Sequence, residues 1–518
     1  MTPERSRRSS LFSLFILLMM LCRVGILAQG TPPPGLALMD AVRMTLARDP
    51  NVAIEATRVD TARGSLQIAS GQFDPVVVSG LSQTTSRVPQ SISSSDETRT
   101  LQGTLGVSKE FRTGLVLEPS LLLDNTQDVT AGSGALNTGT LRFQLRQPLL
   151  RGRGRAAVQA AELSAEREVA ASGLDLRFAV AQRVQVVAAQ YWQVRAAEHN
   201  LAVLRASEQS SRELLESTRK LIAADQVPAA EIVQIEASLT SAESARIGGE
   251  RDLFAQKQTL GREIGLDAAE IAGLPLPSDP FPEIRPGEAP SAARARDFID
   301  LALRSRADLE AARQRRIETE LQRKAAENAL KPQLDLILAP GYSGLATDPG
   351  AGGFFGPLFR NVPGASTVLS LALSWPTLNE RALGELLQVD AAQRQNDLAI
   401  ALLVKGIGAD VPAALDAVDR DALRLAKARE AVGLFERAFL NEEKKLKAGT
   451  STLLDLITQR DRLTAARQTE VAAELALALS LLDLRFRTGT LVGSGGGPTG
   501  EVELTRLTTL PSPKEGAP

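Results

Sequence analysis

Residues Leu141–Ala161 read LRFQLRQPLLRGRGRAAVQAA, and the pattern of the sequence changes in the middle of this stretch. Leu141, Phe143 and Leu145 alternate with polar residues, which is the period-two pattern of a strand with one apolar face. After Pro148 the residues become rich in alanine, which favours a helix. The stretch therefore predicts an amphipathic strand that runs into a long helix.

Other alternating segments predict a sheet of several strands. They occur at residues 76–86, 101–111, 115–123, 334–342 and 369–375. Residues 76–147 hold enough alternation for four strands, and residues 333–375 hold enough for two. Strands of about ten residues with one apolar face are typical of an outer-membrane barrel, and a soluble sheet with one wet face has the same pattern.

An internal repeat connects the two halves of the chain. The aligned pairs are Leu46 with Leu303, Val52 with Leu309, Pro75 with Pro332, Pro148 with Pro376, and Gly265 with Gly489. In each copy a helical segment ends at a proline that a strand follows, because proline cannot continue a helix. We therefore expect two copies of one plan: helix, strands, very long helix, tight turn and returning helix.

The long helices carry the apolar spacing of a coiled coil, with steps of three, four or seven residues. In the first helix the apolar residues are Leu176, Val180, Val184, Val187, Tyr191, Val194, Leu201 and Leu204. In the second they are Leu415, Val418, Ala422, Leu425, Val432, Phe435, Phe439 and Leu446. A helix over 149–223 would extend on the order of 110 Å. In the second helix we expect a kink near Pro412.

Composition excludes several classes of function. The chain has one histidine, His199, and one cysteine, Cys22, which leaves no partner for a catalytic or zinc-binding cluster. We expect no enzyme activity, no cofactor and no metal site, and a solvated or capping role for His199. The net charge of −2 and the lack of aromatic residues among the arginines of 151–155 argue against nucleic-acid binding.

The N-terminus predicts export. Arg5, Arg7 and Arg8 precede the apolar run LFSLFILLMMLC, which is too short for a membrane-spanning helix and suits a signal peptide over residues 1–28. The mature chain would then have no cysteine and no disulfide. Beyond this segment the sequence predicts no transmembrane helix.

Together these features resemble the outer membrane efflux proteins typified by TolC. The resemblance covers the mature chain and rests on LALMDAVRMTLARDPNVAIEA, RQPLLRGRGR, AADQVPAAEIVQIEASL, SWPTLNERA and KAGTSTLLDLITQRDRL, in that order. It implies a mainly α fold with a transmembrane β-barrel, in which a homotrimer builds one β-barrel in outer-membrane lipid and one hollow α-barrel in the periplasm. It also implies a passive exit channel of a tripartite efflux or type I secretion system, which a periplasmic adaptor and an inner-membrane pump recruit.

The resemblance and the repeat divide the chain into segments. The expected domains are the signal peptide at 1–28, a first repeat at 36–266 with strands at 76–147, a Pro-rich linker at 267–292, a second repeat at 293–490 with strands at 333–375, and a flexible C-terminal tail at 491–518, in which EVELTRLTT is the one candidate for an ordered stretch.

The resemblance also implies roles for individual residues. Acidic residues would constrict the periplasmic tip, at Asp455 and, in the first repeat, Glu231. An adaptor would dock at the two tip turns, at Ala224, Asp225, Gln226, Gly449, Thr450 and Ser451. Pro148 and Pro376 would be strand-to-helix hinges, and Trp375, Arg151 and Arg153 would anchor the chain at the membrane interface. The family has a second acid three residues after the first, but Thr458 stands there, and Asp455 could instead be a carboxylate at a helix N-terminus.

Several alternatives remain open at the level of the sequence. The unequal copies allow a barrel of 12 or 18 strands, or an extra hairpin outside the bilayer. A periplasmic coiled-coil adaptor or scaffold would explain the helices and the export, and a surface adhesin would explain the strands. The sequence does not distinguish drug efflux from protein secretion, nor does it identify the exported substrate, pump or adaptor.

Overall fold

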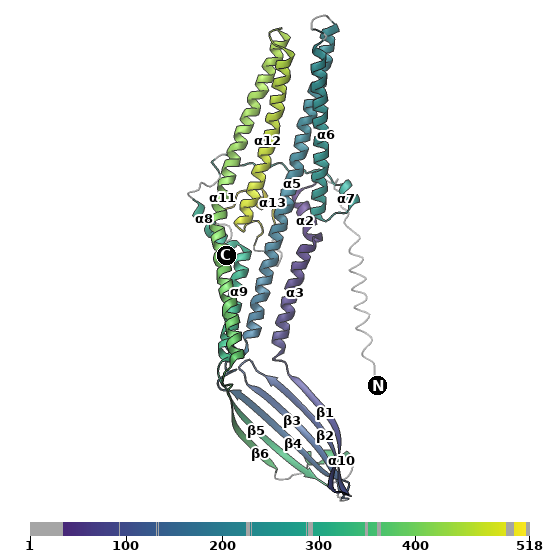
Figure 1. Cartoon of the computed structure of the whole chain (residues 1–518), viewed down its shortest axis with the longest axis vertical. Helices are drawn as coiled ribbons and strands as arrows, with labels where there is room; N and C mark the ends of the chain where they lie inside the picture. The colour runs from purple at the N-terminus through teal and green to yellow at the C-terminus, as the bar shows by residue number, and fades with distance from the viewer. Residues whose placement is uncertain are drawn as a thin grey trace, which may run out of the picture.

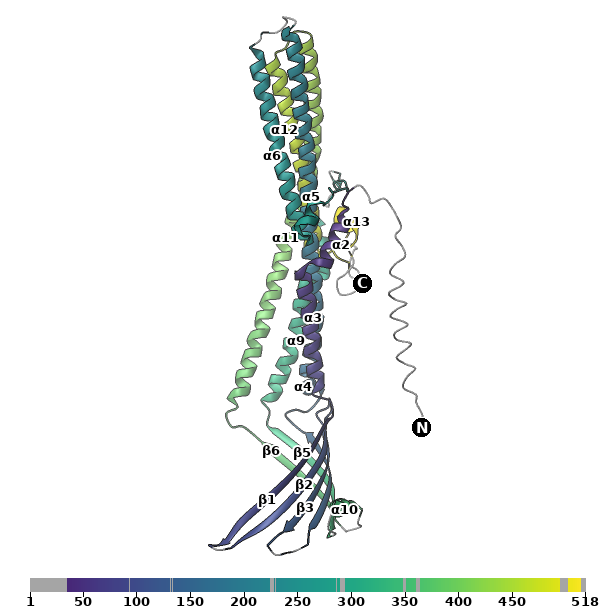
Figure 2. The same ribbon diagram turned by 90° about the vertical axis from the view of Figure 1, so that its right-hand side faces the viewer.

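The computed structural model describes residues 35–513 except for 93, 131, 133, 224–227, 229, 286, 289–293, 348–350, 360–363 and 494–501. The predicted signal peptide and the turn residues Ala224, Asp225 and Gln226 therefore lie outside the described residues. The described chain is a long column of helices with a sheet at one end and two helical hairpins at the other (Figure 1, Figure 2).

The order of elements along the chain repeats once. The first set is α2 (Leu38–Arg48), α3 (Pro50–Gly71), β1 (Val76–Ser91), β2 (Ser94–Glu110), β3 (Val116–Asp128), β4 (Leu136–Pro148), α4 (Arg155–Val158), α5 (Ala160–Ala223), α6 (Glu231–Ile264) and α7 (Ala268–Ala272). The second set is α8 (Ala295–Ser305), α9 (Ala307–Ala329), β5 (Gln333–Ala346), α10 (Ala351–Phe355), the 3₁₀ helix η2 (Gly356–Leu358), β6 (Ala365–Ser374), α11 (Glu380–Lys447), α12 (Leu453–Arg487) and α13 (Leu504–Thr508).

All six strands belong to one antiparallel sheet in the order β1-β2-β3-β4-β5-β6. The extra strand pair of the first set is thus part of the same sheet, and the alternative of a separate hairpin is wrong. Within the described residues β1 and β6 each pair on one side only, so the sheet of a single chain is open. A closed barrel is not formed by one copy.

The first long helix starts later than the sequence suggested. We expected helix from residue 149, but 149–154 forms a turn in which Gly152 and Gly154 have φ angles of 80° and 89°. Glycine adopts this left-handed region without the strain that a side chain would cause. After the short α4, helix α5 then runs without a break for 64 residues, roughly 95 Å at the standard helical rise.

The coiled-coil stripe of α5 forms the core of the column. All eight stripe residues predicted for this helix are buried. In α11, Leu415, Val418, Ala422 and Leu425 are buried, whereas the four stripe residues nearer the tip are only half-buried. The second hairpin therefore leaves part of its apolar stripe uncovered in a single chain.

Segments far apart in the sequence meet halfway along the column, where α7, α8 and α13 surround the long helices (Figure 1, Figure 2). The buried Tyr191 hydroxyl bonds the Asp279 carboxylate at 2.8 Å and accepts from the backbone N–H of Ser278 at 3.1 Å. Its neighbour Trp192 stacks on Phe281 with ring centroids 5.4 Å apart. These contacts fix the Pro-rich linker against α5.

The C-terminal segment is also packed here, which corrects the expectation of a flexible tail for residues 502–513. Leu507 is fully buried. Arg485, which is 1% exposed, donates hydrogen bonds to the carbonyl oxygens of Thr509 and Leu510, both at 2.8 Å. A buried guanidinium needs acceptors, and this segment supplies them.

The helix α11 contains an 18-residue window apolar enough to cross a membrane by length and composition, contrary to our expectation, although only 22% of that window is buried. Exposed leucines occur in the first third of α11, at Leu383, Leu387, Leu398 and Leu402. They recur at helical spacing and form one stripe. Pro412 lies inside α11, which continues through it.

Candidate functional site

The sheet has one apolar and one polar face. A row across the apolar face joins Leu105, Leu121, Leu141, Tyr342 and Ala365. The next row on the other face joins Gly106, Ser120, Arg142, Gly341 and Ser366. The register places the apolar residues of neighbouring strands on the same face of the sheet. The sequence shows this alternation only within each strand.

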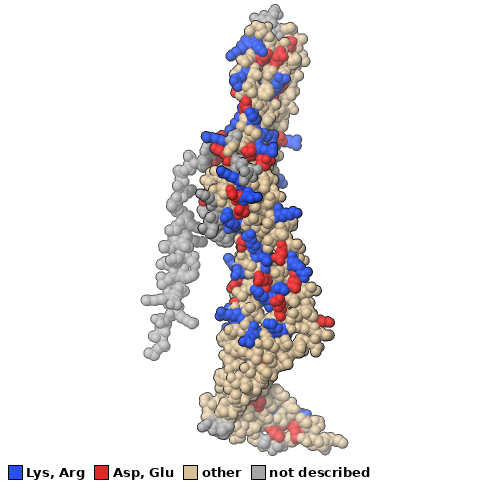
Figure 3. Space-filling view, turned by 90° about the vertical axis from the view of Figure 1, so that its left-hand side faces the viewer, with Lys and Arg blue, Asp and Glu red and all other residues tan. Residues whose placement is uncertain are grey.

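The apolar face is exposed in the single chain. Leu369, Leu371 and Phe143 are 70%, 62% and 46% exposed. Figure 3 shows charged side chains over the helices and few on the adjoining part of the sheet. A contiguous apolar surface of this kind marks contact with another protein or with lipid.

At the end of the sheet away from the helices, the β5–β6 connection packs on this apolar face. A Cβ atom at Gly139 would lie 3.0 Å from Pro357, and one at Gly103 would lie 3.3 Å from the ring of Phe354. At Gly344 it would overlap the Pro357 carbonyl. Glycines in the strands therefore form the groove that accepts α10 and η2.

The strand-to-helix junctions combine predicted residues with two that the sequence analysis missed. Pro148 is the last residue of β4, and Arg151 donates to the Gln333 side chain at 2.7 Å. Pro376 and the 68% exposed Trp375 follow β6. The missed residue Asn328 accepts from the backbone N–H of Gly152 at 2.7 Å.

The second missed residue is Asn379, which precedes α11 with a φ angle of 46°. Its side chain donates to the Leu330 carbonyl at 3.3 Å, which joins the start of α11 to the end of α9. Asparagine tolerates the left-handed conformation better than most other residues with side chains. An asparagine just before the helix was therefore the sequence signal that could have indicated this turn. Arg153, by contrast, is exposed at this level.

The described tip turn joins α11 to α12 through a compact set of hydrogen bonds. Gly449 has a φ angle of 71°, and its N–H donates to the Leu446 carbonyl at 3.0 Å. Thr450 donates through its backbone N–H to the Lys445 carbonyl at 2.9 Å. This is the usual way to end a helix with glycine. Ser451 hydrogen-bonds Glu442.

Asp455 caps the helix that follows this turn. Thr452 accepts from the Asp455 N–H at 3.2 Å, and its hydroxyl donates to the Asp455 carboxylate at 2.6 Å. These hydrogen bonds favour the ionised form and lower the pKa of the Asp455 carboxyl. In the single chain Asp455 therefore has the geometry of the alternative role, a carboxylate that caps a helix N-terminus.

Glu231 is at the corresponding place in the other hairpin. It is the first residue of α6, and its backbone N–H donates to the Pro228 carbonyl at 3.1 Å. The negative side chain is favoured there by the helix dipole.

Below the tip, a ladder of polar contacts links α12 to α5. Its rungs are Arg460 to Ser211 at 2.5 Å, Thr464 to Ser207 at 3.2 Å, and Gln468 to Asn200 at 3.1 Å. Arg460 is 5% exposed and also donates to Ser238 on α6 at 2.6 Å. We call these contacts the tip ladder. The sequence analysis missed it, because nothing within α12 reveals which helix lies opposite.

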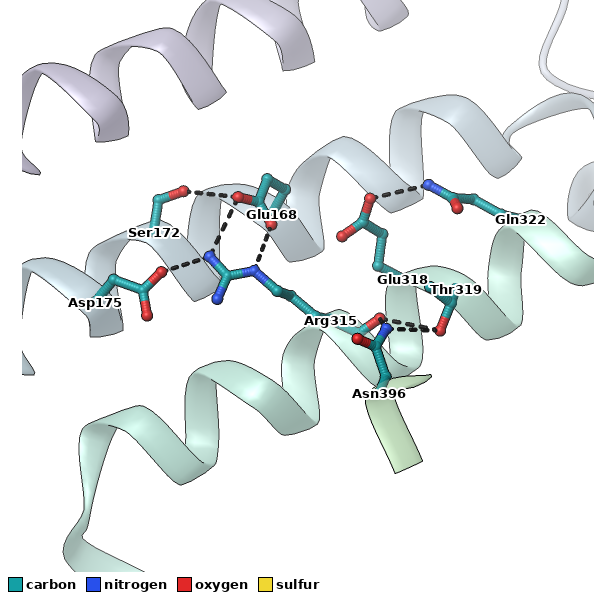
Figure 4. Close-up of polar contacts among 8 residues, drawn as sticks. All are labelled: Glu168, Ser172, Asp175, Arg315, Glu318, Thr319, Gln322 and Asn396. Atoms are coloured by element: carbon teal, nitrogen blue, oxygen red, sulfur yellow. Dashed lines mark hydrogen bonds and ion pairs between the residues drawn. The ribbon is translucent and has the colours of Figure 1, made fainter. Parts of the chain in front are cut away.

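A second polar cluster lies between α5 and α9 on the side of the column nearer the sheet (Figure 4). Arg315 donates to Glu168 at 3.3 Å and pairs with Asp175. Burial, reinforced by the nearby Glu168, raises the pKa of the Glu318 carboxyl. Two carboxylates thus pair with the guanidinium, and the Glu318 carboxyl nearby accepts a hydrogen bond from Gln322 at 2.9 Å (Figure 4).

His199 lies beside the linker. Its ring packs edge-on against Phe281 with centroids 5.6 Å apart, and its Nδ1 lies 3.7 Å from the Glu474 carboxylate. No group of three or more His, Cys, Asp or Glu residues suitable for a metal ion occurs in the described part of the chain.

The comparisons with known proteins agree with this architecture. Residues 298–490 match the family model described as outer membrane efflux protein. No curated protein matches the chain.

Three solved structures show the same fold over most of the chain. The outer membrane protein VceC from Vibrio cholerae is 18% identical, with a TM-score of 0.60 over 87% of this chain and 96% of VceC. The Campylobacter jejuni CmeC outer membrane channel is 14% identical, with a TM-score of 0.60 over 88% and 85%. The open state of the Neisseria gonorrhoeae MtrE outer membrane channel is 16% identical, with a TM-score of 0.59 over 87% and 88%.

At these identities the solved structures support the fold, and the likeness to the family rests on the sequence match over residues 298–490. A fold that is mainly α with one sheet is confirmed. Residues 298–490 thus match the family described as outer membrane efflux protein, and the chain shares its fold with solved outer membrane channels.

Proposed function

We propose that three copies of this chain form a passive outer-membrane exit duct for a tripartite efflux or type I secretion system. The observation that carries the proposal is the open sheet, apolar on one face and polar on the other, that continues into helices of 64 and 68 residues. The apolar face meets lipid, and the polar face lines a water-filled pore. Energy comes from a pump, because the duct has no chemistry of its own.

The free edges of the sheet support assembly. An unpaired strand edge is a template for another chain, and a membrane barrel cannot leave an edge open in lipid. Pairing β1 of one copy with β6 of the next closes a barrel of eighteen strands, six from each of three chains. The proposal therefore favours a barrel of 18 strands over one of 12.

The exposed stripe of α11 supports the same assembly. In one chain Leu398 and Leu402 are 70% and 72% exposed. Next to an open sheet, a neighbouring copy covers such a stripe and makes a wall of helices. This explanation accounts for the apolar window of α11 without a membrane-spanning helix.

The far end of the duct is the site of opening. The turns at Gly449, Thr450 and Ser451 and at Ala224, Asp225 and Gln226 dock the adaptor. Asp455 and Glu231 ring the constriction, and the tip hairpins move apart like an iris. Pro148 and Pro376 are the hinges at the other end, and Trp375, Arg151 and Arg153 anchor the chain at the membrane interface.

The main alternative, a soluble periplasmic adaptor or scaffold, has no use for the exposed apolar face. A pair of neighbouring substitutions on β6 tests the proposal. Leu371 lies on the apolar face, and Ser370 lies on the polar face. A charge on the lipid face is costly, whereas a charge in the pore is tolerated.

We expect purified wild-type protein to form trimers in detergent and to conduct in planar bilayers. Leu371→Glu should abolish insertion and conductance, and Ser370→Glu should conduct with altered ion selectivity. Wild-type protein that stays soluble without detergent and never conducts would favour the scaffold. Equal behaviour of the two variants would overturn the assignment of the faces.

A further inference from the structure

A cationic side chain lies at the border of the apolar face of the sheet, on the side nearest the helices. The register places Lys109 of β2 in one row with four leucines, Leu117, Leu145, Leu338 and Leu369. Lys109 therefore lies on the lipid-facing side, one residue before the end of β2. The strand enters the periplasmic turn there, at the level where lipid headgroups begin.

A cavity of about 300 Å³ opens beside Lys109. Its walls include two aromatic rings, a leucine and three cations, from Phe73, Lys109, Phe111, Arg112, Leu115 and Arg155. The residues come from three places in the chain: the end of α3, the β2–β3 turn and the start of α4. The volume is at the lower end of the range for small-molecule pockets.

Some of these charges are already neutralised. Arg112 donates to the Glu162 carboxylate at 2.8 Å and lies 4.7 Å from the centroid of the Phe73 ring. Asp74 also acts on Arg112 electrostatically. Arg112 is therefore a fixed wall of the cavity, held by an ion pair and a cation–π contact.

Within the part of the chain that the structure describes, neither Lys109 nor Arg155 has such a neutralising partner. Lys109 donates to the Phe73 carbonyl, which carries no net charge. Arg155 is exposed and makes no ion pair with any described residue. One further acid, Glu110, lines the cavity, but its row joins Val116 and Arg146 on the polar face. Lys109 and Arg155 are thus the two cations that line the cavity without an acidic partner among the described residues.

We propose that this cavity binds the phosphate headgroup of an anionic phospholipid from the periplasmic leaflet of the outer membrane. The phosphate lies between Lys109 and Arg155, and the acyl chains lie along the leucine row. A basic pocket that adjoins an apolar track suits a negatively charged amphiphile. A headgroup with its own ammonium fits less well, because that ammonium would meet the same two cations. The inference rests on the apolar face meeting lipid, as proposed above.

The test compares retention of phosphatidylglycerol and phosphatidylethanolamine by the purified full-length channel, with native mass spectrometry as the readout. Wild-type protein should retain phosphatidylglycerol in preference. Removing two interfacial charges in Lys109→Gln/Arg155→Gln should reduce that preference on the order of tenfold. The matched control is Arg142→Gln, because Arg142 is an exposed cation on the polar face of the same sheet and does not line the cavity. The control should retain the preference.

A general effect of positive charge would lower retention equally in the control and would overturn the site. Displacement of the lipid by millimolar inorganic phosphate would show a free-anion site and would overturn the lipid. The lipid proposal would also be overturned if the wild-type protein showed no preference for phosphatidylglycerol. Arg155→Gln alone, at an exposed position, serves if the double variant does not fold. Conductance is measured for each variant as well. A variant that loses the lipid preference but still conducts has lost the lipid site, whereas a protein that never conducts contradicts the proposed duct.

Discussion

Arg460 on α12 donates a 2.5 Å hydrogen bond to the buried hydroxyl of Ser211 on α5. The two residues belong to different hairpins, so this contact joins the two halves of the chain near the tip. Arg460 also reaches Ser238 on α6. One guanidinium thus connects three helices, and any motion that separates the hairpins must break these bonds.

We predict that Arg460→Gln loosens the tip. A hydrogen bond to a charged group contributes about 1.5–3 kcal/mol, and the shorter glutamine cannot span both hydroxyls. Thermal stability should fall, and the fraction of time that the channel is open in a planar bilayer should rise. Arg467→Gln is the control, since Arg467 forms an exposed pair with Glu436 at 2.9 Å. Exposed pairs of this kind contribute little.

A gating role for the tip ladder would be contradicted by a channel that is less stable yet opens no more often. In that case Arg460 would contribute to packing alone. Thr464→Val provides an independent check, because it removes the Thr464 to Ser207 bond and leaves Arg460 intact.

We predict that Glu318 makes stability depend on pH. Burial and then the nearby Glu168 raise the pKa of the Glu318 carboxyl above 4.5 in the folded chain. The folded state therefore binds the proton more tightly than the unfolded state. The stabilisation is fully present below pH 4.5 and is lost as the pH rises through the folded pKa.

Glu318→Gln should therefore raise thermal stability at pH 7.5 and change it little at pH 4.5. Glu320→Gln is the matched control on the same helix, because the hydrogen bond from the exposed Lys324 lowers the pKa of the Glu320 carboxyl. The control should not stabilise the protein at pH 7.5. Unfolding curves at pH 7.5 and pH 4.5 test this prediction. A Glu318→Gln protein that is less stable than the wild type at pH 7.5 would contradict it.

The sequence predicted those parts of the fold that repeat along one element. Period-two alternation located the strands, and the spacing of Leu176, Val180 and Val184 located the buried face of α5. Both patterns arise because each element buries one side. The half-buried Phe435 and Phe439 follow the same spacing, yet their cover is not supplied by a single chain.

Features that depend on contacts between distant segments were missed. The C-terminal segment looked flexible because its order depends on Arg485, which precedes it by more than fifteen residues. The start of the long helix was placed too early, at residue 149, because the sequence did not reveal that the turn around Gly152 and Gly154, which have positive φ angles, extends to residue 154. For the candidate site, the turn at Gly449 was located, whereas Arg460 was not, since its partners belong to another hairpin.

We predict that Arg485→Gln lowers thermal stability strongly and releases the C-terminal segment. Arg485 is 1% exposed and holds the Thr509 and Leu510 carbonyls. Removing a buried partner leaves those acceptors unsatisfied, at about 1–3 kcal/mol each. Limited proteolysis within residues 502–513 measures the release. Arg467→Gln again serves as control, and equal resistance of both variants to the protease would refute the anchoring role.

Asp455 combines a cap and a candidate gate, and two variants separate the roles. Thr452→Ala removes the cap and keeps the charge, so it should cost about 1 kcal/mol of helix stability and leave ion selectivity unchanged. Asp455→Asn removes the charge and keeps the shape. If three carboxylates ring the constriction, this variant should lose cation preference in planar bilayers.

The pH dependence of the wild type provides a further check on the gate. Hydrogen bonds from Thr452 lower the pKa of the Asp455 carboxyl below 3.8 in the single chain. A carboxyl with a depressed pKa keeps its charge above that value and loses it as the pH falls through it, so cation preference should persist from pH 7 down to pH 4.5. Loss of preference well above pH 4.5 would show that repulsion in the trimer outweighs the cap. Unchanged preference in Asp455→Asn would leave Asp455 as a cap only and would move the gate to other residues.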